Sequence, residues 1–241
     1  MEKRRDSATA YIILADGFET IEALTPLDVL RRCGVEVTTI SLNQTRAVRS
    51  SHGVTVEADA TMEDFMHNCN CCASAIGTGN AGTSSTAGSS TNASSSTNAS
   101  STSCGPNTSN TGTSTTASSA VRQALILPGG YPGYKKLCES AEVGALITQF
   151  HKEGKLLCAI CGAPTALKAN QICRGAAITC HTSVKEELSD YYSILSSAVV
   201  KYMNIITGMG AGRSLEFAFA IAEALTSKEK VEEIKAKMEI I

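Results

Sequence analysis

The chain has 241 residues, a formal net charge of −2 and 43% hydrophobic residues. This near-neutral balance gives no electrostatic reason to expect nucleic-acid binding. The first residues are charged and lead into only a short apolar run at residues 11–15, so we expect neither a signal peptide nor a membrane span. Without a secretory signal, the ten cysteines are expected to be reduced thiols of a cytoplasmic protein.

The first part of the chain alternates between strand and helix patterns. In order, these are a buried strand at 9–15, a helix at 18–33, a second strand at 36–42, and a pair of short strands within 46–58 that turns at His52-Gly53. The helix is predicted from apolar side chains at three-residue steps, namely Ile21, Leu24, Leu27 and Leu30, and Gly34 closes it. This alternation predicts a parallel sheet covered by helices.

A low-complexity segment then interrupts the pattern. From about residue 70 to residue 119 the chain consists mainly of Ser, Thr, Asn, Gly and Ala. Such a composition cannot bury enough apolar surface to offset the entropy of ordering, so we predict a flexible insertion. The roughly 190 residues outside it suit one α/β domain, so residues 1–241 are expected to be a single interrupted domain. The adjacent Asn68-Cys-Asn-Cys-Cys72 has no partner pair at zinc-finger spacing, and no metal site is expected.

Strands and helices alternate again after the insertion. The predicted strands cover 124–127, 156–160 and 178–180, with a strand or hairpin within 199–207. The predicted helices cover 143–152, 163–169, 214–227 and 229–238. The first of these strands runs into a glycine-rich turn, Leu127-Pro-Gly-Gly130.

A cysteine is expected at the apex of a very tight turn. Only Cys161 and Gly162 separate the strand at 156–160 from the next helix, and Pro164 fits that helix's first turn because no backbone donor is needed there. A sulfur at a helix N-terminus lies among unpaired N–H groups and the positive end of the helix dipole, which favours the thiolate. The arrangement is typical of a nucleophile elbow, and the alternative is a buried structural cysteine.

Two stretches resemble a known family. Ala159-Ile-Cys-Gly-Ala-Pro-Thr-Ala-Leu167 resembles the elbow of the ThiJ/PfpI superfamily, most of all its Parkinsonism-associated protein deglycase branch. Ala15-Asp-Gly-Phe-Glu-Thr-Ile-Glu22 resembles the first-helix motif and places Glu22 on the family's catalytic glutamate. Chain order alone allows Glu22 to lie above the carboxyl ends of the sheet, but it fits an exposed helical glutamate equally well. The resemblance implies that the carboxyl hydrogen-bonds the sulfur, acts as acid and base, and has a raised pKa.

The resemblance also assigns roles to backbone groups and to a histidine. Gly129 and Gly130 match the family's second strand–helix turn, where a backbone N–H helps Gly162 to form an oxyanion pocket. His181 matches a family histidine near the cysteine, whereas the residue pattern alone indicates an ordinary surface or core histidine.

Several motifs depart from the family or suggest other classes of protein. His52 and Met209 stand where better-known deglycase members have arginines, which puts stabilisation of an oxidised cysteine by those arginines in doubt. Gly162 stands where the protease-like branch has a histidine, so a general base next to the nucleophile is missing. Cys158-Ala-Ile-Cys161 matches a redox motif but begins inside an apolar strand, and Gly208-Met-Gly-Ala-Gly212 lacks the third glycine of a dinucleotide fingerprint.

We therefore expect a flavodoxin-like α/β sandwich, with a mostly parallel sheet and helices on both faces. The resemblance implies a cofactor-free cysteine enzyme in which Cys161 attacks a dicarbonyl or an early glycation adduct and Glu22 moves the proton. It also implies a homodimer. The alternatives are a redox sensor or chaperone that uses an oxidisable Cys161 and, less favoured, a peptidase or amidase.

Overall fold

The structure is a computed structural model that describes residues 8–68 and 122–240. The insertion predicted at about residues 70–119 lies outside the described residues, and so do the cysteines at 69, 71 and 72. Within the described ranges, none of the helices combines the length and the apolar character needed to cross a membrane.

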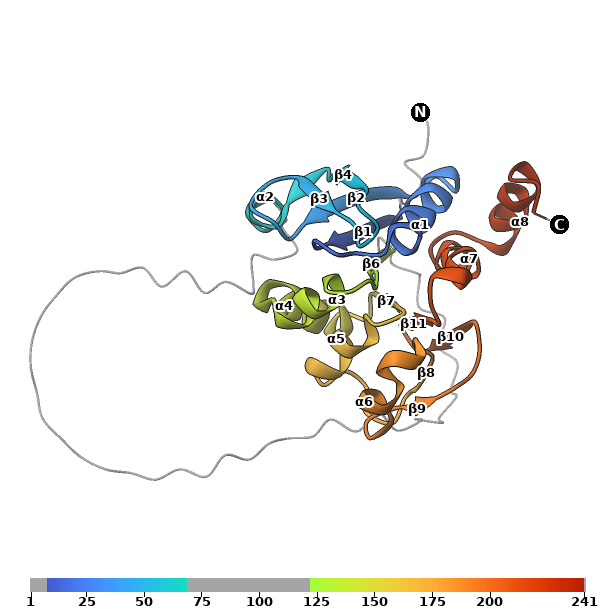
Figure 1. The fold of residues 1–241 in the computed structure, drawn as a ribbon. Helices are drawn as coiled ribbons and strands as arrows, with labels where there is room; N and C mark the ends of the chain where they lie inside the picture. The colour runs from blue at the N-terminus through green and yellow to red at the C-terminus, as the bar shows by residue number, and fades with distance from the viewer. Residues whose placement is uncertain (1–7, 69–121, 241) are drawn as a thin grey trace, which may run out of the picture.

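A seven-stranded sheet runs through the centre of the fold, in the order β10-β11-β7-β6-β1-β2-β5 (Figure 1). Its strands are β1 (Thr9–Leu14), β2 (Glu36–Ser41), β5 (Ala60–Thr61), β6 (Gln123–Leu127), β7 (Leu156–Ile160), β10 (Val199–Tyr202) and β11 (Ile205–Gly208). All neighbouring pairs are parallel except β10 and β11, which form an antiparallel hairpin. Because β7, β6 and β1 are adjacent, the turns that follow their carboxyl ends meet at one edge of the sheet.

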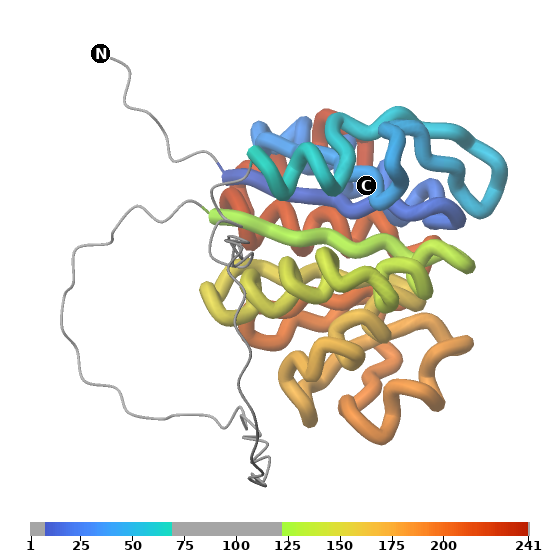
Figure 2. The backbone as a smooth tube through the Cα atoms, turned by 90° about the vertical axis from the view of Figure 1, so that its left-hand side faces the viewer, coloured from blue at the N-terminus to red at the C-terminus, as the bar shows by residue number. Residues whose placement is uncertain are grey.

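Helices cover both faces of this sheet (Figures 1 and 2). One face packs against α1 (Thr20–Arg32), α7 (Ser214–Leu225) and α8 (Lys228–Lys237). The other packs against α2 (Met62–Asn68), α3 (Gly133–Glu139), α4 (Ala141–Lys152) and α5 (Pro164–Ala169). Each face of the sheet has its own hydrophobic core. Alternate residues of β6 pack into the two cores: Ile126 packs on the α1 side, whereas Leu125 and Leu127 pack on the α4 side. The predicted three-layer, mostly parallel architecture is therefore confirmed.

Smaller elements lie at the edges of the sheet. The predicted pair of short strands is present as β3 (Ala47–Arg49) and β4 (Thr55–Glu57). A second small sheet pairs β8 (Ala177–Ile178) with β9 (Ser193–Ile194), so the strand predicted at 178–180 ends earlier than expected. Sequence patterns missed β9, α3, α6 (Lys185–Ser189) and the 3-10 helices Thr182–Val184 and Ala211–Arg213. Each is seven residues or shorter, too short to show a clear period.

The buried face of α1 differs from the predicted stripe. Ile21 is 48% exposed, and Leu24 and Leu27 are only half-buried. The residues that face the core are Glu22, Ala23, Pro26, Val29 and Leu30. This set follows the i, i+4, i+7, i+8 spacing of a true helical face, from which a strict three-residue step drifts away. The helix therefore buries its glutamate and leaves an isoleucine on the surface.

Candidate active site

Cys161 occupies a strained backbone position between β7 and α5. Its φ of 64° lies in the left-handed region, which costs a non-glycine residue about 1–3 kcal/mol. Hydrogen bonds on both sides hold it there. Its N–H donates to the Gly208 carbonyl at 3.0 Å, and its carbonyl accepts from the His181 N–H at 2.9 Å. The predicted tight turn is thus present, with the cysteine at its apex.

Glu22 lies fully buried in the first turn of α1. The helix begins at Thr20, two residues later than predicted, because the Glu19 side chain caps it by accepting from the Glu22 N–H at 2.8 Å. Glu22 Oε2 accepts from the Gly129 N–H at 2.9 Å. Its Oε1 is also buried and has no hydrogen-bond partner within the part of the chain that the structure describes. A buried carboxyl oxygen without a partner is costly, which indicates a functional rather than a structural role.

Gly129 brings Glu22 and Cys161 together. A Cβ added to Gly129 would lie 2.6 Å from Glu22 Oε2, 2.7 Å from Cys161 Cβ and 3.1 Å from its sulfur. Every other residue would push the carboxyl and the thiol apart, so glycine is required for this close approach. The two side chains that the resemblance pairs are therefore neighbours in the structure.

The two acids share one buried site. Burial raises the pKa of Glu22 to about 7, although contacts with the Cys161 thiol and the Gly129 N–H partly oppose it. Burial, together with the adjacent Glu22 carboxylate, raises the pKa of the Cys161 thiol to about 12. The carboxyl therefore loses its proton first, and a second negative charge in the pair is disfavoured.

The surroundings of the Cys161 sulfur act on its pKa in opposite directions. The N–H groups of Gly162 and Gly130 lower the pKa of Cys161, as expected at a helix N-terminus, but burial and Glu22 outweigh them. The raised pKa of Cys161 favours the thiol in the free protein, and the raised pKa of Glu22 leaves its carboxyl partly protonated at neutral pH. The sulfur can gain its charge by passing its proton to Glu22.

The three predicted glycines have different partners. The N–H groups of Gly130 and Gly162 hydrogen-bond the sulfur, whereas the N–H of Gly129 bonds Glu22. Gly130 has a φ of 91°, and a Cβ there would meet the Glu19 nitrogen at 2.3 Å. The ring of Tyr134, which sequence analysis did not single out, covers Gly162 closely enough that a Cβ would meet it at 2.7 Å.

His181 is tied to the elbow through its backbone. Its exposed ring accepts from the Ser183 N–H at 3.2 Å through Nδ1, which also lies 2.8 Å from the Ser183 hydroxyl. The ring thus caps the short helix that follows, and the structure does not show it hydrogen-bonded to Cys161. The resemblance implies a histidine that acts beside the cysteine, and we propose that His181 would do so through Nε2, because Ser183 engages Nδ1.

Comparisons with known proteins match this architecture. The sequence pattern of the DJ-1/PfpI family matches residues 8–224. The chain belongs to this family. It is 31% identical to Protein dj-1beta of Drosophila melanogaster over 229 residues, 95% of each chain. It is 29% identical to the Parkinson disease protein 7 homolog of Danio rerio over 231 residues, again 95% of each chain.

A solved structure, and a relative that matches over part of its length, support the same family. The crystal structure of Drosophila melanogaster DJ-1beta matches with a TM-score of 0.73 at 29% identity, covering 98% of this chain and 99% of that chain. The glutathione-independent glyoxalase DJR-1.2 of Caenorhabditis elegans is 40% identical over 107 residues, 44% of this chain and 56% of its own. The predicted superfamily and its flavodoxin-like fold are thereby confirmed.

The residues that replace the expected arginines lie in different surroundings. His52 is 72% exposed, and its Nδ1 lies 3.8 Å from Oε1 of Glu19. Met209 is half-buried and donates its N–H to the Ala198 carbonyl at 2.9 Å. Glu19 was missed by the sequence analysis, which placed it inside the helix. Glutamate is not one of the usual N-cap residues, so no capping signal was visible in the sequence at this position.

The described cysteines are all free and differ in exposure. Cys33, Cys158, Cys173 and Cys180 are buried. Cys158 lies inside β7 with no exposed surface, and burial raises its pKa, so its placement does not fit a thioredoxin-like pair. Cys161 and Cys138 are only partly buried. Among the described residues, no cluster of three or more His, Cys, Asp or Glu side chains could hold a metal ion.

Proposed function

We propose that this chain is a cofactor-independent cysteine enzyme that converts reactive dicarbonyls, or their early glycation adducts, to hydroxy acids. The observation that carries this proposal is the buried Glu22 carboxyl, with its pKa raised to about 7, beside Cys161. An acid–base group works best when its pKa lies near the operating pH. The name of the Caenorhabditis elegans relative supports this reaction class.

With methylglyoxal as substrate, the reaction begins at the Cys161 thiol. The sulfur attacks the aldehyde carbon while its proton passes to the Glu22 carboxylate. Glu22 then gives this proton to the former carbonyl oxygen, which forms the hemithioacetal and restores the carboxylate. Glu22 then moves a proton from this carbon to the neighbouring carbonyl carbon, through an enediol, which leaves a thioester of lactate. Water hydrolyses the thioester and frees the thiol. The sequence adds one water to methylglyoxal and needs no external oxidant or reductant.

Lactate formation by the purified protein tests this function. Wild type should convert methylglyoxal to lactate, and both Cys161→Ser and Glu22→Gln should lower kcat/KM by about a hundredfold or more. Cys33→Ala is the matched control, since Cys33 lies buried at the C-terminal end of α1 and its loss should leave turnover in place. Lactate formation that survives in Cys161→Ser would refute the assignment.

A redox sensor is the second candidate. It is favoured by the partial exposure of Cys161 and by the two N–H donors and the protonatable carboxyl around its sulfur, which could bind sulfinic oxygens. Treatment of the protein with limiting peroxide, followed by peptide mass spectrometry to locate the oxidised cysteine, distinguishes the sensor from the enzyme when it is combined with the lactate assay. Oxidation centred on Cys161 without any dicarbonyl turnover would favour the sensor. A peptidase or amidase remains less favoured, because Gly162 supplies no general base and the His181 ring is engaged by Ser183.

We further propose that the protein is cytoplasmic, forms a homodimer and has a role in carbonyl or oxidative stress. Members of the family are commonly dimeric, and α1 leaves Ile21 48% exposed while the nearby β3–β4 turn leaves Val54 45% exposed. A hydrogen bond from Thr20 to Ser50 ties these two elements together. Ile21→Asp should therefore shift the protein towards monomers in sedimentation analysis. An unchanged dimer would exclude this surface, and cell fractionation checks the compartment.

A further inference from the structure

An exposed tyrosine follows directly after the backbone that holds the sulfur. Gly130 donates its N–H to the Cys161 sulfur, and Tyr131 is the next residue in the chain. Tyr131 is 72% exposed. A single exposed aromatic residue is ordinary on a protein surface, so its meaning depends on what lies around it.

Tyr131 is paired with a second aromatic ring over the elbow. The ring centroids of Tyr131 and Tyr134 lie 6.3 Å apart with an interplanar angle of 58°, a tilted arrangement within the range of favourable aromatic pairs. The Tyr134 ring packs against Gly162, where an added Cβ would meet it at 2.7 Å. Gly162 also donates its N–H to the Cys161 sulfur. The two rings therefore form one aromatic surface that begins at the backbone donors of the sulfur and extends to solvent.

A cation already lies on this aromatic surface. Nζ of Lys135 is 5.4 Å from the centroid of the Tyr134 ring and 3.6 Å from Oε2 of Glu187. A cationic group on a substrate would meet the positive charge of Lys135 at the same ring, whereas the negative faces of the rings disfavour an anionic group. A neutral aromatic group meets neither penalty and can pack against the exposed ring of Tyr131.

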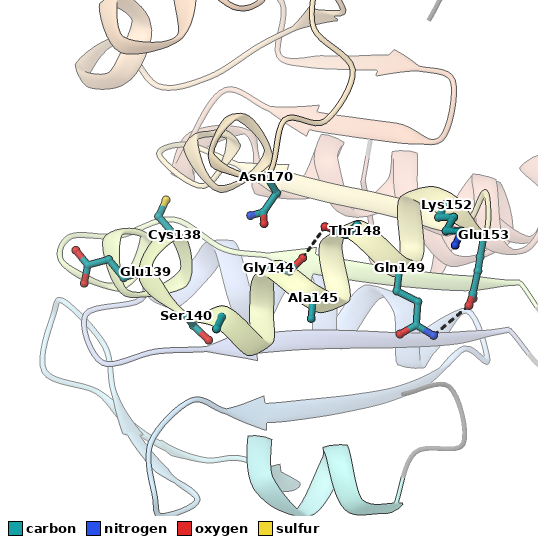
Figure 3. Close-up of a pocket in the computed structure, with 11 residues that line it drawn as sticks. Cys138, Glu139, Ser140, Gly144, Ala145, Thr148, Gln149, Lys152, Glu153 and Asn170 are labelled. Carbon is teal, nitrogen blue, oxygen red and sulfur yellow. Dashed lines mark hydrogen bonds between the residues drawn. The ribbon is translucent and has the colours of Figure 1, made fainter. Parts of the chain in front are cut away.

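The cavity along α4 is not part of the aromatic surface. It measures about 850 Å³ and is lined by residues of α4, by the end of α3 and by Asn170 (Figure 3). Neither Cys161 nor either of the two tyrosines borders it. This cavity therefore does not adjoin the nucleophile, whereas the aromatic surface does.

We propose that Tyr131 is a specificity-determining residue that selects dicarbonyls with a neutral aromatic substituent. The inference rests on the proposed function, because it concerns which dicarbonyl the Cys161 thiol attacks. In such a substrate the aldehyde carbon bonds to the sulfur, and the aromatic group on the neighbouring carbonyl carbon packs against Tyr131. Phenylglyoxal represents this class, since it carries a phenyl group where methylglyoxal carries a methyl group. Its product is mandelate, formed by the same addition of one water.

The ratio of kcat/KM for phenylglyoxal to kcat/KM for methylglyoxal tests this selection. In Tyr131→Ala the ratio should fall about two- to tenfold, the factor that one aromatic pair contributes, because phenylglyoxal loses a ring contact that methylglyoxal does not make. Tyr131→Phe keeps the ring and should retain the wild-type ratio. Initial rates of mandelate and lactate formation are the measurements.

Met203→Ala is the matched control. Met203 is also 72% exposed, but it lies in the turn between β10 and β11. β11 begins just after Met203 and runs parallel to β7, which ends at Cys161, so these two residues lie at opposite edges of the sheet. Met203→Ala should therefore keep the wild-type rates with both substrates.

Alkylation of Cys161 gives a second measurement that needs no turnover. Phenacyl bromide and bromoacetone have the same reactive carbon and differ only in carrying phenyl or methyl on the ketone. With either reagent a sulfur–carbon bond forms as bromide leaves, and the thiol proton passes to solvent. Peptide mass spectrometry after competition between the two reagents gives the ratio of phenacyl to acetonyl adducts at Cys161. This ratio should fall in Tyr131→Ala and stay at the wild-type value in Tyr131→Phe and Met203→Ala.

Three results would overturn the proposal. They are an unchanged ratio in Tyr131→Ala in either measurement, an equal fall in Met203→Ala, and a fall in Tyr131→Phe as large as that in Tyr131→Ala. A wild type that forms neither lactate nor mandelate would instead refute the proposed function. The alkylation ratio would then still decide whether Tyr131 selects the substituent of a compound that reacts at Cys161.

Discussion

At the residue scale, the proposed chemistry depends on how one negative charge is shared by Glu22 and Cys161. The carboxyl has one oxygen bonded to Gly129 and one buried without a partner among the described residues. The carboxyl also hydrogen-bonds the Cys161 thiol, and through this contact it can take up the proton of the thiol. A fully solvated glutamate would be ionised well below neutral pH and would hold such a proton poorly.

The same burial makes stability depend on pH. The pKa of Glu22 rises from 4.5 to about 7 on folding, so the folded state binds the extra proton between these values. The stability that this group contributes is therefore complete below pH 4.5 and is lost as pH rises through 7. Glu22→Gln cannot ionise, so its free energy of unfolding relative to wild type should increase by on the order of 3 kcal/mol between pH 4.5 and pH 8. Urea denaturation at both pH values checks this, and a difference that does not change with pH would contradict it.

At the element scale, the site is built where the turns after β1, β6 and β7 meet. β1 leads to Glu22 on α1, β6 leads to Gly129 and Gly130, and β7 leads to Cys161. No single turn contains the whole site. The relative placement of these three neighbouring strands is what brings carboxyl, backbone donors and thiol within contact.

Gly129→Ala tests this convergence. The added methyl group would overlap Glu22 Oε2 and Cys161 Cβ, so the turns must separate. We expect a loss of about 1–3 kcal/mol of stability and a fall in turnover larger than the stability loss explains. Gly212→Ala is the control, because a Cβ there would meet no atom within 4 Å. Turnover and melting temperature are measured for both variants and compared with those of the wild type. Normal activity in Gly129→Ala would contradict the described contact.

Sequence patterns predicted the long, apolar elements better than the contacts between them. The predicted strand at 156–160 has the observed bounds because an apolar run between a turn and a helix start is a strong local signal. Burial of Glu22 was not predictable from periodicity, because Ile21 beside it is the more apolar residue yet points to the surface. The contact between Thr165 and Cys138 was also missed, since it joins α5 to α3, an element too short to show a pattern. Local physics determines the elements, whereas the protonation of the site depends on tertiary burial.

At the scale of the whole molecule, the two chain segments that flank the insertion are anchored independently of it. On the N-terminal side of the insertion, α2 buries Met62 and Phe65 in the core. Arg122, just before β6, donates to the Thr226 carbonyl at 2.8 Å. β6 then lies between β1 and β7 in the sheet. The fold thus has its own contacts on both sides of residues 69–121.

Replacing residues 70–119 with a short Gly/Ser linker should therefore leave the fold intact. Loop length changes the closure free energy by only about 0.6 kcal/mol per doubling, so the melting temperature should stay nearly constant. Soluble expression, melting temperature and lactate formation of the shortened chain are the measurements. A collapse in stability would show that the segment is part of the folded domain.

Cys161 is proposed to act as the nucleophile with Glu22 as its proton acceptor, and the pH dependence of kcat/KM for methylglyoxal is the sharpest test of this pairing. The carboxylate form of Glu22 must take the thiol proton, so kcat/KM should rise with pH and level off, with a midpoint near 7. Cys161→Ser should show no such activity at any pH. A profile that is flat from pH 5 to pH 9, or the same profile in Cys161→Ser, would contradict the account.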